Sequence, residues 1–500
     1  MSDQLLRSFK GDIRAPLPLH PLEKALLWIA ALNVCSLPWM LGGMRPWAQF
    51  TSLGLSSVAL ILALIPRHYR DEYARQSDYT LHLWRKLVRW PLFWIGGVFF
   101  GYVMIQALNP GYEFVQKETS WSMHKIDHIE WLPTGMRTPF EMMNTWRQMM
   151  IWGAPFLLAC ALWTGFTRRK SVINLLTIIV INATVLAIVG IAARETAPNK
   201  ILWLLDGQKN YCFASFVYKN HAGAFFALMV GFSIVVAVWH HTRAYRLQQR
   251  SNPAGLFLLL ATVQSTAILL TYSRAAIIIT AGFLIVTTFI SGIQLLNRGR
   301  PSRASFYLAI LCIGFIAFSG MAAKLINSDQ KIDRIMDLAE GDHSDRSVIT
   351  RKIAWQAGYD MGMEKPIAGW GAGGFRFLFP RYQTAYPEIS YIGQGERRRF
   401  TFWENAHNDY LQLWIEMGYI GVGIILLGSV YLALYFIRVG GAKSTTAKSM
   451  AGAIILPLSH ALTDFPLQNP AILVSLAVLV SSSIFNLDGK PSGSATRLFH

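Results

Sequence analysis

Repeated apolar segments of about 20 residues constrain the fold of this chain more than any other feature of its sequence. A segment of this length with few charges is what an α-helix needs to cross a bilayer. The 500-residue sequence is 53% hydrophobic and 15% charged, which is too apolar for a soluble domain of this size. We therefore predict an all-α polytopic membrane protein with about twelve transmembrane helices. They lie near residues 25–43, 49–66, 88–108, 149–166, 172–193, 221–239, 254–272, 275–296, 305–325, 409–436, 449–466 and 470–487.

Basic residues gather in every second connection between these segments. A net charge of +18 would suggest nucleic acid as the partner of a soluble protein, but here the positions of Lys and Arg decide the interpretation. Short cytoplasmic loops carry the excess of positive charge, so we assign these connections and both termini to the cytoplasm and expect no nucleic-acid partner. The residues concerned are Arg67, Arg70, Arg75, Arg85, Lys86, Arg89, Arg168, Arg169, Lys170, Arg243, Arg246, Arg250, Arg298, Arg300, Arg303, Arg438, Lys443 and Lys448.

The longer loops fall on the opposite, external side. The loop at 326–408 contains basic residues, but long loops cross the membrane largely regardless of charge. We predict an external subdomain there, with an amphipathic helix from about Arg346 to Met361. The other external connections are the loops at 109–148 and 194–220 and the tight turns around Ser273 and Asp464. The predicted organisation is a tail at 1–24, spans 1–9 at 25–325, the loop subdomain at 326–408, spans 10–12 at 409–487 and a tail at 488–500.

Three polar clusters stand on this external side, each at the start of a predicted membrane helix. A helix N-terminus has unpaired N–H groups and about half a positive charge, so three converging N-termini would form an anion site. The added charges of Arg274 and Lys219 indicate a phosphate or diphosphate as the ligand. The clusters are Lys219-Asn220-His221, Ser273-Arg274 and His407-Asn408-Asp409.

A structural explanation competes with each of these functional assignments. Arg274 follows one apolar run and begins the next, where an arginine can extend to the lipid head groups. His407 can be a capping or solvated loop residue, or a base that the helix dipole keeps neutral and able to accept a proton. The carboxylate of Asp409 would oppose that effect of the dipole, and the sequence does not decide between the two.

Gly369, Gly371 and Gly374 fit the pattern GxGxxG, but neither a strand nor a βαβ unit surrounds them. We interpret this stretch as a flexible turn that returns the loop to the membrane, with Arg376 and Arg381 beside it as candidate contacts to a diphosphate or glycan. The sequence has no DxD, HExxH or paired CxxC motif, so we predict no bound metal and no cofactor.

Aromatic residues are frequent in the first external loop, from Tyr112 to Trp146. Their rings could stack on sugars or form an interfacial belt at the membrane surface. Both interpretations stay open at this stage.

Five short segments between about residues 200 and 470 stand in a specific order and spacing. They are NHAGAFFAL (Asn220–Leu228), YSRAA (Tyr272–Ala276), PIAGWGAGGF (Pro366–Phe375), AHNDYLQLWIEMGYIG (Ala406–Gly421) and SHALTDFPLQNPA (Ser459–Ala471). Together they resemble the O-antigen ligase and polymerase superfamily, whose members are bacterial inner-membrane glycosyltransferases. These enzymes take a glycan from an undecaprenyl-diphosphate carrier at the periplasmic face.

The resemblance implies a GT-C-like glycosyltransferase with a periplasmic active site and a metal-independent, inverting transfer. In the family, arginines hold the diphosphate and the histidine of the HND segment activates the acceptor hydroxyl; Arg274 matches one such arginine, and His407 matches the histidine. A second family arginine is replaced here by Tyr211. Lys209 and Lys219 are the candidates to take over its role, but an ammonium lacks the two-pronged geometry of a guanidinium. This departure leaves the choice between ligase and polymerase open.

The sequence therefore predicts an enzyme that moves a glycan from undecaprenyl diphosphate to a lipid or glycan acceptor, with membrane lipids around it. The acceptor could be lipid A-core, a growing polysaccharide or a protein. A transporter or flippase for the same lipid-linked glycan is the main alternative, and it would carry broken helices with charges at the membrane midplane. A non-catalytic component of a polysaccharide export assembly is the third possibility.

Overall fold

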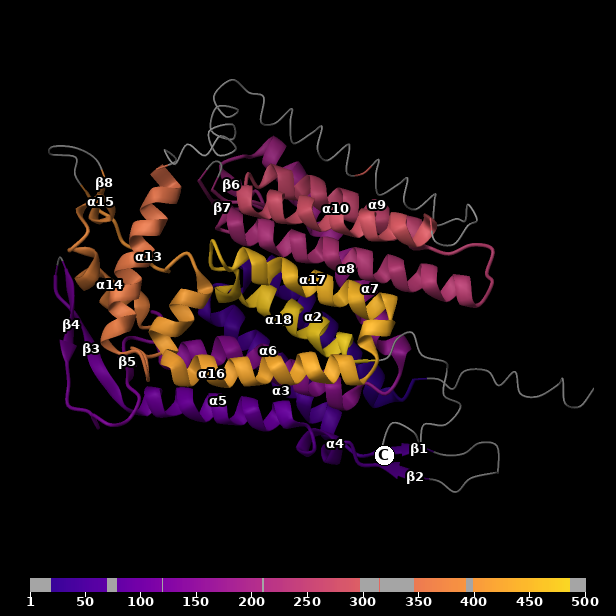
Figure 1. Cartoon of the computed structure of the whole chain (residues 1–500), viewed down its shortest axis with the longest axis horizontal. Coiled ribbons are helices and arrows are strands. Elements are labelled where there is room, and N and C mark those ends of the chain that lie inside the picture. Colours follow the sequence, from indigo (N-terminus) through magenta and orange to yellow (C-terminus); the bar gives the residue numbers. More distant parts are fainter. Residues whose placement is uncertain are drawn as a thin grey trace, which may run out of the picture.

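Long helices make up most of the computed structural model, which describes residues 19–69, 79–118, 120–208, 211–296, 314, 346–392 and 399–485. They run roughly side by side and form a bundle, with a smaller mixed body at one end (Figure 1). The bundle helices are α2 (Pro21–Trp39), α3 (Pro46–Leu64), α5 (Pro91–Leu108), α6 (Thr145–Gly165), α7 (Arg169–Thr196), α8 (Lys219–Arg246), α9 (Ala254–Leu270), α10 (Arg274–Leu296), α16 (Asp409–Arg438), α17 (Thr445–His460) and α18 (Pro470–Ser483).

Each of these helices coincides with one of the predicted membrane segments. Within the described residues, six helices are long and apolar enough to cross a membrane, namely α3, α5, α6, α7, α8 and α16. The apolar helices α9, α10 and α18 have shorter qualifying stretches. The structure is thus mostly helical and has the character of a membrane protein, as predicted. Apart from residue 314, the span predicted at 305–325 lies outside the described residues, and the total of twelve crossings stays a prediction.

The ends of the helices follow from local sequence. Proline stands at the first helical position of α3, α5 and α18, where its missing N–H group leaves no hydrogen bond unmade. Asn144, Asn408 and Asn469 cap α6, α16 and α18, because each side chain accepts a hydrogen bond from a backbone N–H group of the first turn.

Helix α8 is the centre of the bundle and α16 lies at its edge. In the most apolar 18-residue stretch of each helix, 94% of the residues of α8 are buried, but only 11% of those of α16. Gln264 of α9 joins the central helices by two hydrogen bonds, donating to Thr184 of α7 over 2.9 Å and accepting from Ser233 of α8 over 2.9 Å. Satisfied polar groups of this kind are tolerated in an apolar interior. Much of the surface of α16 therefore remains for lipid, whereas α8 meets mainly other helices.

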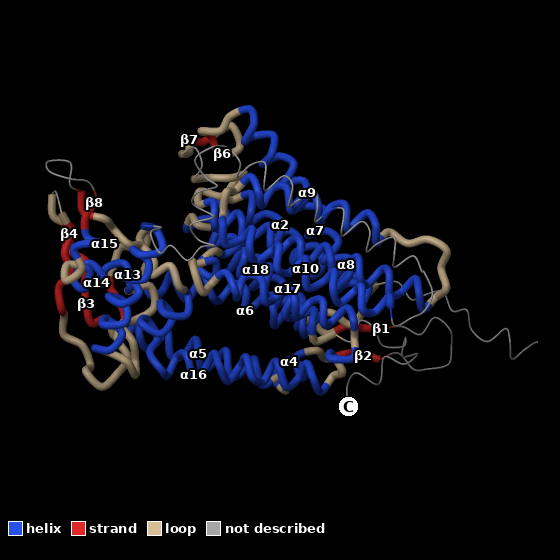
Figure 2. The backbone as a smooth tube through the Cα atoms, turned by 45° about the horizontal axis from the view of Figure 1, so that its top comes forward, coloured by secondary structure: helices blue, strands red, loops and turns tan. Residues whose placement is uncertain are grey.

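The mixed body at the end of the bundle combines two loops that are far apart in sequence (Figure 2). The first loop forms a three-stranded sheet in which β3 (Pro110–Gln116) pairs antiparallel with β4 (Trp121–Lys125) and parallel with β5 (Gly135–Arg137). The second loop contributes α13 (Arg346–Glu364), α14 (Phe375–Gln383), α15 (Pro387–Ser390), β8 (Tyr391–Ile392) and β9 (Arg399–Phe400). A shared apolar core holds them together; it includes Met136, Met361, Phe375 and Phe379. The predicted helix near 346–361 is thus present, but the first loop belongs to the same body.

Three small elements lie outside the bundle helices and the mixed body, besides short 3-10 turns. They are the hairpin of β1 (Arg67–Tyr69) and β2 (Tyr79–Leu81), the helix α4 (Trp84–Val88), and the hairpin of β6 (Lys200–Ile201) and β7 (Leu205–Asp206).

The glycine-rich turn packs closely against a break in α16. At Gly418 the helix is interrupted, with φ 60° and ψ −172°, and the amide of Gly371 donates to the carbonyl of Glu416 over 2.8 Å. A Cβ at Gly418 would lie 2.2 Å from the carbonyl oxygen of Ile367, and one at Gly369 would lie 2.4 Å from that of Glu416. Glycine is required at both positions because the two backbones touch. The turn therefore has a structural role in addition to returning the loop to the membrane, and its predicted flexibility stays a prediction.

Replacing Gly418 by alanine is expected to destabilise the protein by about 1–3 kcal/mol or more, because its backbone conformation is almost restricted to glycine and the added methyl group meets backbone. The midpoint of thermal unfolding in detergent measures this effect. Gly423→Ala is the matched control on the same helix, since a Cβ there has no neighbour within 4 Å. Equal melting temperatures for the two variants would contradict the proposed contact.

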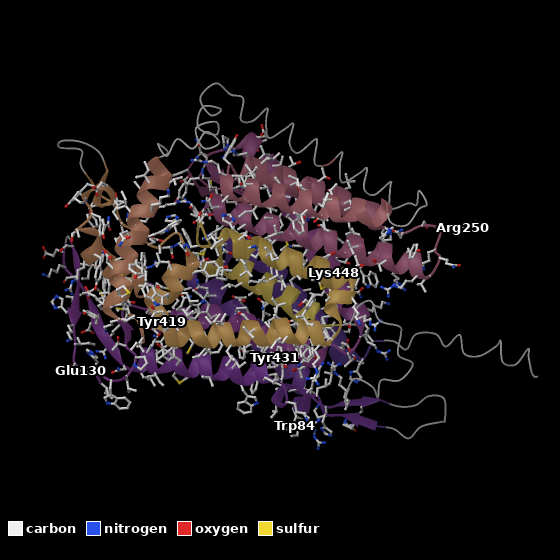
Figure 3. The ribbon with its side chains drawn as sticks, in the orientation of Figure 1. Trp84, Glu130, Arg250, Tyr419, Tyr431 and Lys448 are labelled. Atoms are coloured by element: carbon white, nitrogen blue, oxygen red, sulfur yellow. The ribbon has the colours of Figure 1, made fainter. Side chains whose placement is uncertain are left out.

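Two of the predicted cytoplasmic basic residues contact the bundle, where Arg67 is buried and Lys86 is half-buried. Arg67 lies 3.1 Å from Glu23 in an ion pair and donates to the carbonyl of Gly165 over 2.7 Å. Lys86 lies over the ring of Trp163, 4.4 Å from its centroid. These residues tie α2, α4 and α6 together at the end of the bundle that carries Arg250. Figure 3 shows Arg250 at the opposite end of the molecule from Glu130.

Candidate functional site

Four helix ends and one short connection meet beside the mixed body. Helix α17 ends at His460, the chain turns through Asp464, and the 3-10 helix η4 (Pro466–Gln468) leads to the Asn469 cap of α18. This connection packs against the first turns of α8 and α16. Because α8 and α16 both begin here, residues about 190 positions apart become neighbours, and the polar groups predicted at 219–221 and 407–409 share one region.

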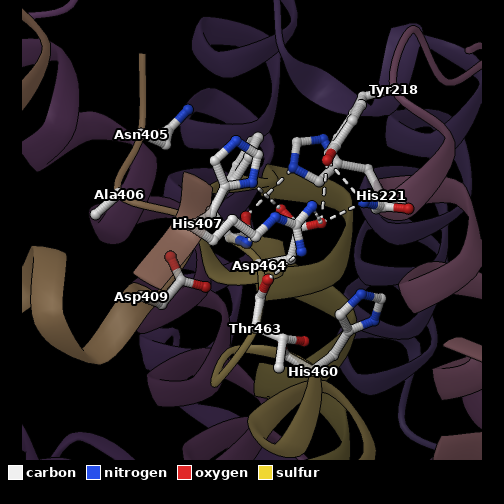
Figure 4. A network of polar contacts seen from close by, with 12 residues as sticks. Tyr218, His221, Asn405, Ala406, His407, Asp409, His460, Thr463 and Asp464 are labelled. Atoms are coloured by element: carbon white, nitrogen blue, oxygen red, sulfur yellow. Dashed lines mark hydrogen bonds and ion pairs between the residues drawn. The ribbon is translucent and has the colours of Figure 1, made fainter. Parts of the chain in front are cut away.

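His407 and Asp464 form the central pair of this region. Nδ1 of His407 lies 3.1 Å from Oδ1 of Asp464, and the side chain of Asp464 is only 2% exposed while that of His407 is 24% exposed. Figure 4 shows the imidazole facing this carboxylate. His407 has a φ of +51°, an unusual value for a residue other than glycine. Such strain is tolerated where the surrounding structure fixes it, and it accompanies functional sites.

The carboxylate of Asp464 is held by several further groups. Its Oδ2 accepts a hydrogen bond from the hydroxyl of Tyr218 over 3.0 Å and another from the side-chain amide of Asn220. The guanidinium of Arg351, on α13, lies 3.8 Å away and also donates to the carbonyl of Thr463 over 2.8 Å. Burial alone would raise the pKa of Asp464, but the hydrogen bond and charge of His407 and the charge of Arg351 outweigh it, so the pKa lies below its ordinary value. Asp464 is therefore an ionised partner for the imidazole.

Aromatic rings fix the orientation of the imidazole. The ring of Phe465 meets that of His407 edge to face at 4.9 Å between centroids, and the ring of Trp403 does so at 5.6 Å. Since Nδ1 faces Asp464, the remaining nitrogen Nε2 is the one that can accept a proton, and it has no hydrogen-bond partner among the described residues. The arrangement matches a general base oriented by a carboxylate.

Four of the predicted site residues have well-defined structural contacts. Asn220 donates to Asp464 and to the hydroxyl of Tyr218, so it belongs to the central pair's surroundings. His221 is buried and bonds through Nε2 to the carbonyl of Phe465 over 3.2 Å. Asn408 caps α16, and Asp409 is 4% exposed and accepts from the amide of Leu467 over 2.8 Å.

These contacts change the expected role of Asp409. The sequence suggested that its carboxylate would influence His407, whereas the carboxylate bonded to the imidazole is that of Asp464. Asp409 instead anchors η4 on the first turn of α16 through Leu467 and Gln468. It therefore positions the connection that carries Asp464.

The predicted cations lie at the same end of the bundle. Arg274 is exposed at the first position of α10, and this turn packs on α8: a Cβ at Gly223 would lie 2.7 Å from the Cβ of Ala276. Lys219 begins α8, and its amide donates to the carbonyl of Tyr211 over 2.7 Å. The ring of Tyr211 packs at 5.3 Å on that of Tyr218. Lys209 lies outside the described residues.

Burial raises the pKa of the Tyr211 hydroxyl, and the carboxylates of Glu404 and Asp464 add to the effect. Tyr211 therefore lies close enough to the central pair for the charge of Asp464 to affect its pKa, which is consistent with its predicted place in the site.

Arg376 and Arg381 occupy different environments on α14. Arg376 lies 4.0 Å from Glu404, which precedes the His407 segment, and burial lowers its pKa. Arg381 is exposed in the last turn of α14. The amides of Gly373 and Phe375 donate to the carboxylate of Glu416 over 3.0 and 3.3 Å. Glu416 therefore fills the anion-binding position at this helix start, and only Arg376 is directed toward the region of the central pair.

The aromatic residues of the loop from Tyr112 to Trp146 fall into two groups, one packed inside the mixed body and one exposed. Trp121 packs in the mixed body against Phe114 and Phe377, at 5.7 and 6.1 Å between centroids. Trp131 is 82% exposed and Trp146 is 41% exposed, so these two rings are available to sugars or to the membrane surface.

Three site residues were not predicted from the sequence: Asp464, Tyr218 and Arg351. The sequence did offer one signal for Asp464, because a single carboxylate stands in a short connection between two apolar helices. Arg351 gave no signal, since it is one of several charges on α13. Its guanidinium supplies a positive charge beside the central pair.

Comparison with known proteins supports the resemblance found in the sequence. A family model described as O-antigen ligase matches residues 254–426, a region that contains Arg274 and His407. The match agrees with the O-antigen ligase and polymerase superfamily and supports an enzyme of that type. No curated protein matches the chain.

Proposed function

We propose that this chain, in which residues 254–426 match the O-antigen ligase family, is a membrane glycosyltransferase. It transfers a glycan from undecaprenyl diphosphate to an acceptor hydroxyl outside the cytoplasm. The observation that carries this proposal is the pair of His407 and Asp464, in which a buried carboxylate orients a partly exposed imidazole. The family supplies the type of reaction, and the pair supplies a base for the acceptor.

The proposed step forms one bond and breaks another at the anomeric carbon of the donor sugar. The acceptor oxygen attacks this carbon, and its proton passes to Nε2 of His407. The bond between the anomeric carbon and the phosphate oxygen breaks, and its electron pair leaves with the polyprenyl diphosphate. Asp464 keeps the proton of the resting imidazole on Nδ1 and stabilises the imidazolium that forms, as a carboxylate does in a hydrolytic triad.

The diphosphate leaving group requires positive charge near the start of α8 and α10. Arg274 and Lys219 begin these two helices, and each helix start adds the partial charge of its unpaired N–H groups. Preorganised cations in a poorly hydrated region stabilise a developing anion without having to reorganise. We assign the diphosphate to this surface, with Arg376 and Tyr211 as further contacts to the diphosphate or the glycan.

The proposed orientation places the reaction at the periplasmic face of the bacterial inner membrane. The basic connections that the structure describes lie at the opposite end of the bundle, which would then face the cytoplasm together with both termini. The charged side chains proposed for the site lie at one end of the helices, which favours an enzyme over a transporter with alternating access.

Transfer by the purified protein tests this function directly. The protein is supplied with an undecaprenyl-diphosphate glycan together with lipid A-core, a polysaccharide primer or an acceptor protein, and the products are identified by mass spectrometry. A covalent product with one acceptor, and release of undecaprenyl diphosphate, is the expected result. Movement of intact donor across a vesicle membrane with no covalent product would instead identify a transporter.

Excess EDTA is expected to leave the transfer rate unchanged within about twofold, since the stabilising charges assigned here are side-chain cations. The measurement compares initial rates with EDTA, with Mg²⁺ and after dialysis. Loss of the activity in EDTA and its return with a divalent cation would show that a metal ion takes part.

A further inference from the structure

An open pocket of about 410 Å³ lies in the mixed body, between the sheet and the glycine-rich turn. One wall comes from the first external loop, including Tyr112, Lys125 and Leu132, and the other comes from the segment that links α13 to the turn, including Lys365 and Ile367. None of the residues of the central pair lines it. The pocket is therefore separate from the region around His407.

Lys365 is the principal charged group of this pocket. Its ammonium donates to the hydroxyl of Thr134 over 3.2 Å and lies over the ring of Trp370, 4.6 Å from the centroid. No carboxylate of the described residues lies within 4.0 Å of it. An ammonium has three donors, so the hydrogen bond to Thr134 does not use all of them. The exposed Lys125 adds a second positive charge, and burial and this charge lower the pKa of Lys365.

Two acidic side chains, Glu130 and Glu364, also line the pocket, and the charge of Glu364 opposes the lowering of the Lys365 pKa by burial. Glu364 accepts a hydrogen bond of 2.6 Å from the hydroxyl of Tyr382, which lies outside the lining. Glu130 stands in the loop wall, where Figure 3 shows it at the extremity of the mixed body. The apolar surface of Leu132, Ile367 and Ala368 completes the lining.

We propose that this pocket binds an acidic saccharide, with the carboxylate of a sugar residue held by Lys365 and Lys125. Sugar rings have polar edges and apolar faces, and the pocket offers hydrogen-bonding groups beside an apolar wall. A charge-assisted hydrogen bond to a partly buried ammonium favours a carboxylate over a neutral sugar. The identification of this saccharide as part of a substrate glycan rests on the proposed transfer function, whereas its binding is independent of transfer.

The test measures binding of a trigalacturonic acid probe to the full-length protein in detergent by titration calorimetry, with maltotriose as the neutral probe. The acidic probe is expected to bind and the neutral probe to bind about tenfold more weakly or worse. Lys365→Gln should weaken binding of the acidic probe by about tenfold, and Lys125→Gln should weaken it less. Lys365→Arg keeps the charge and should retain most of the affinity.

Lys117→Gln is the matched control, because this exposed lysine follows the far end of β3 and does not line the pocket. Each variant's melting temperature shows that it is folded. Equal affinity for the two probes, or unchanged affinity in Lys365→Gln, would overturn the proposal. Displacement of the acidic probe by inorganic phosphate at lower concentration would also overturn it, by identifying a phosphate site. His407→Ala should keep full affinity for the probe, so that failure of binding and failure of transfer are distinguished.

Discussion

Replacing His407 by alanine is expected to lower the rate of glycan transfer by about 10²–10⁴-fold, the contribution that a positioned general base typically makes. Nδ1 of His407 is engaged by Asp464, so Nε2 is the nitrogen that can take the proton of the acceptor. Removing it leaves the donor-binding surface intact. The rate constant for transfer should therefore fall with little change in the affinity for the donor, which single-turnover kinetics and donor titration measure separately.

His82→Ala is the control for His407→Ala, because His82 is exposed beside the β1–β2 hairpin, at the other end of the bundle. It should transfer at the wild-type rate. A transfer rate in His407→Ala within about threefold of the wild-type rate, in protein that melts at the wild-type temperature, would remove the proposed base.

Replacing Asp464 by asparagine is expected to lower the transfer rate by a similar factor, about 10²–10⁴-fold. The amide keeps the shape of the side chain but has no charge to stabilise the imidazolium, and it can favour the wrong tautomer of His407. Residues that act as a unit are not additive, so the double variant should be no slower than the slower single variant. Additive losses would show that Asp464 acts independently of His407. Asp464→Glu should recover part of the rate, which a merely structural role would not predict.

Asp464 should also leave a signature in the pH dependence of stability. Its pKa in the folded protein lies below the ordinary value of 3.8. The ionised carboxylate therefore stabilises the folded state above about pH 4, and this contribution is lost as the pH falls toward the folded-state pKa. The difference in melting temperature between the wild type and Asp464→Asn should be largest near neutral pH and should narrow below pH 4. A constant difference across this range would show that the charge of Asp464 contributes nothing.

Hydropathy was sufficient to locate the helices, because a long apolar run has few alternatives to a helix in lipid. The segment predicted at 221–239 is α8, whose observed bounds are Lys219–Arg246. The same reasoning placed the polar clusters at one end of the bundle, since each cluster precedes a helix that runs in the same direction. The positions of His407 and Arg274 at helix starts were therefore predictable from the order of the apolar segments.

Contacts between distant segments were beyond this reasoning. Asp464 lies 57 residues after His407, and only the packing of η4 against α16 brings them together. The sequence instead suggested Asp409, the nearest carboxylate in the chain, which the structure uses to hold η4. In the same way, the external loop at 109–148 reads as an aromatic-rich connection, and its strands become evident only where β3 pairs with β4 and β5.

The exposure of α16 has a consequence for how a substrate would arrive. This helix begins two residues after His407 and leaves many of its apolar side chains exposed, among them Leu426, Leu427 and Leu434. A donor with a long hydrocarbon tail can approach along such a helix by diffusing in the plane of the bilayer. The methylene groups of the tail then stay among the lipid acyl chains. Moving one of them into water would cost about 0.8 kcal/mol. Only the polar head then has to travel from the membrane surface to the imidazole, and the spent carrier can depart by the same sideways route.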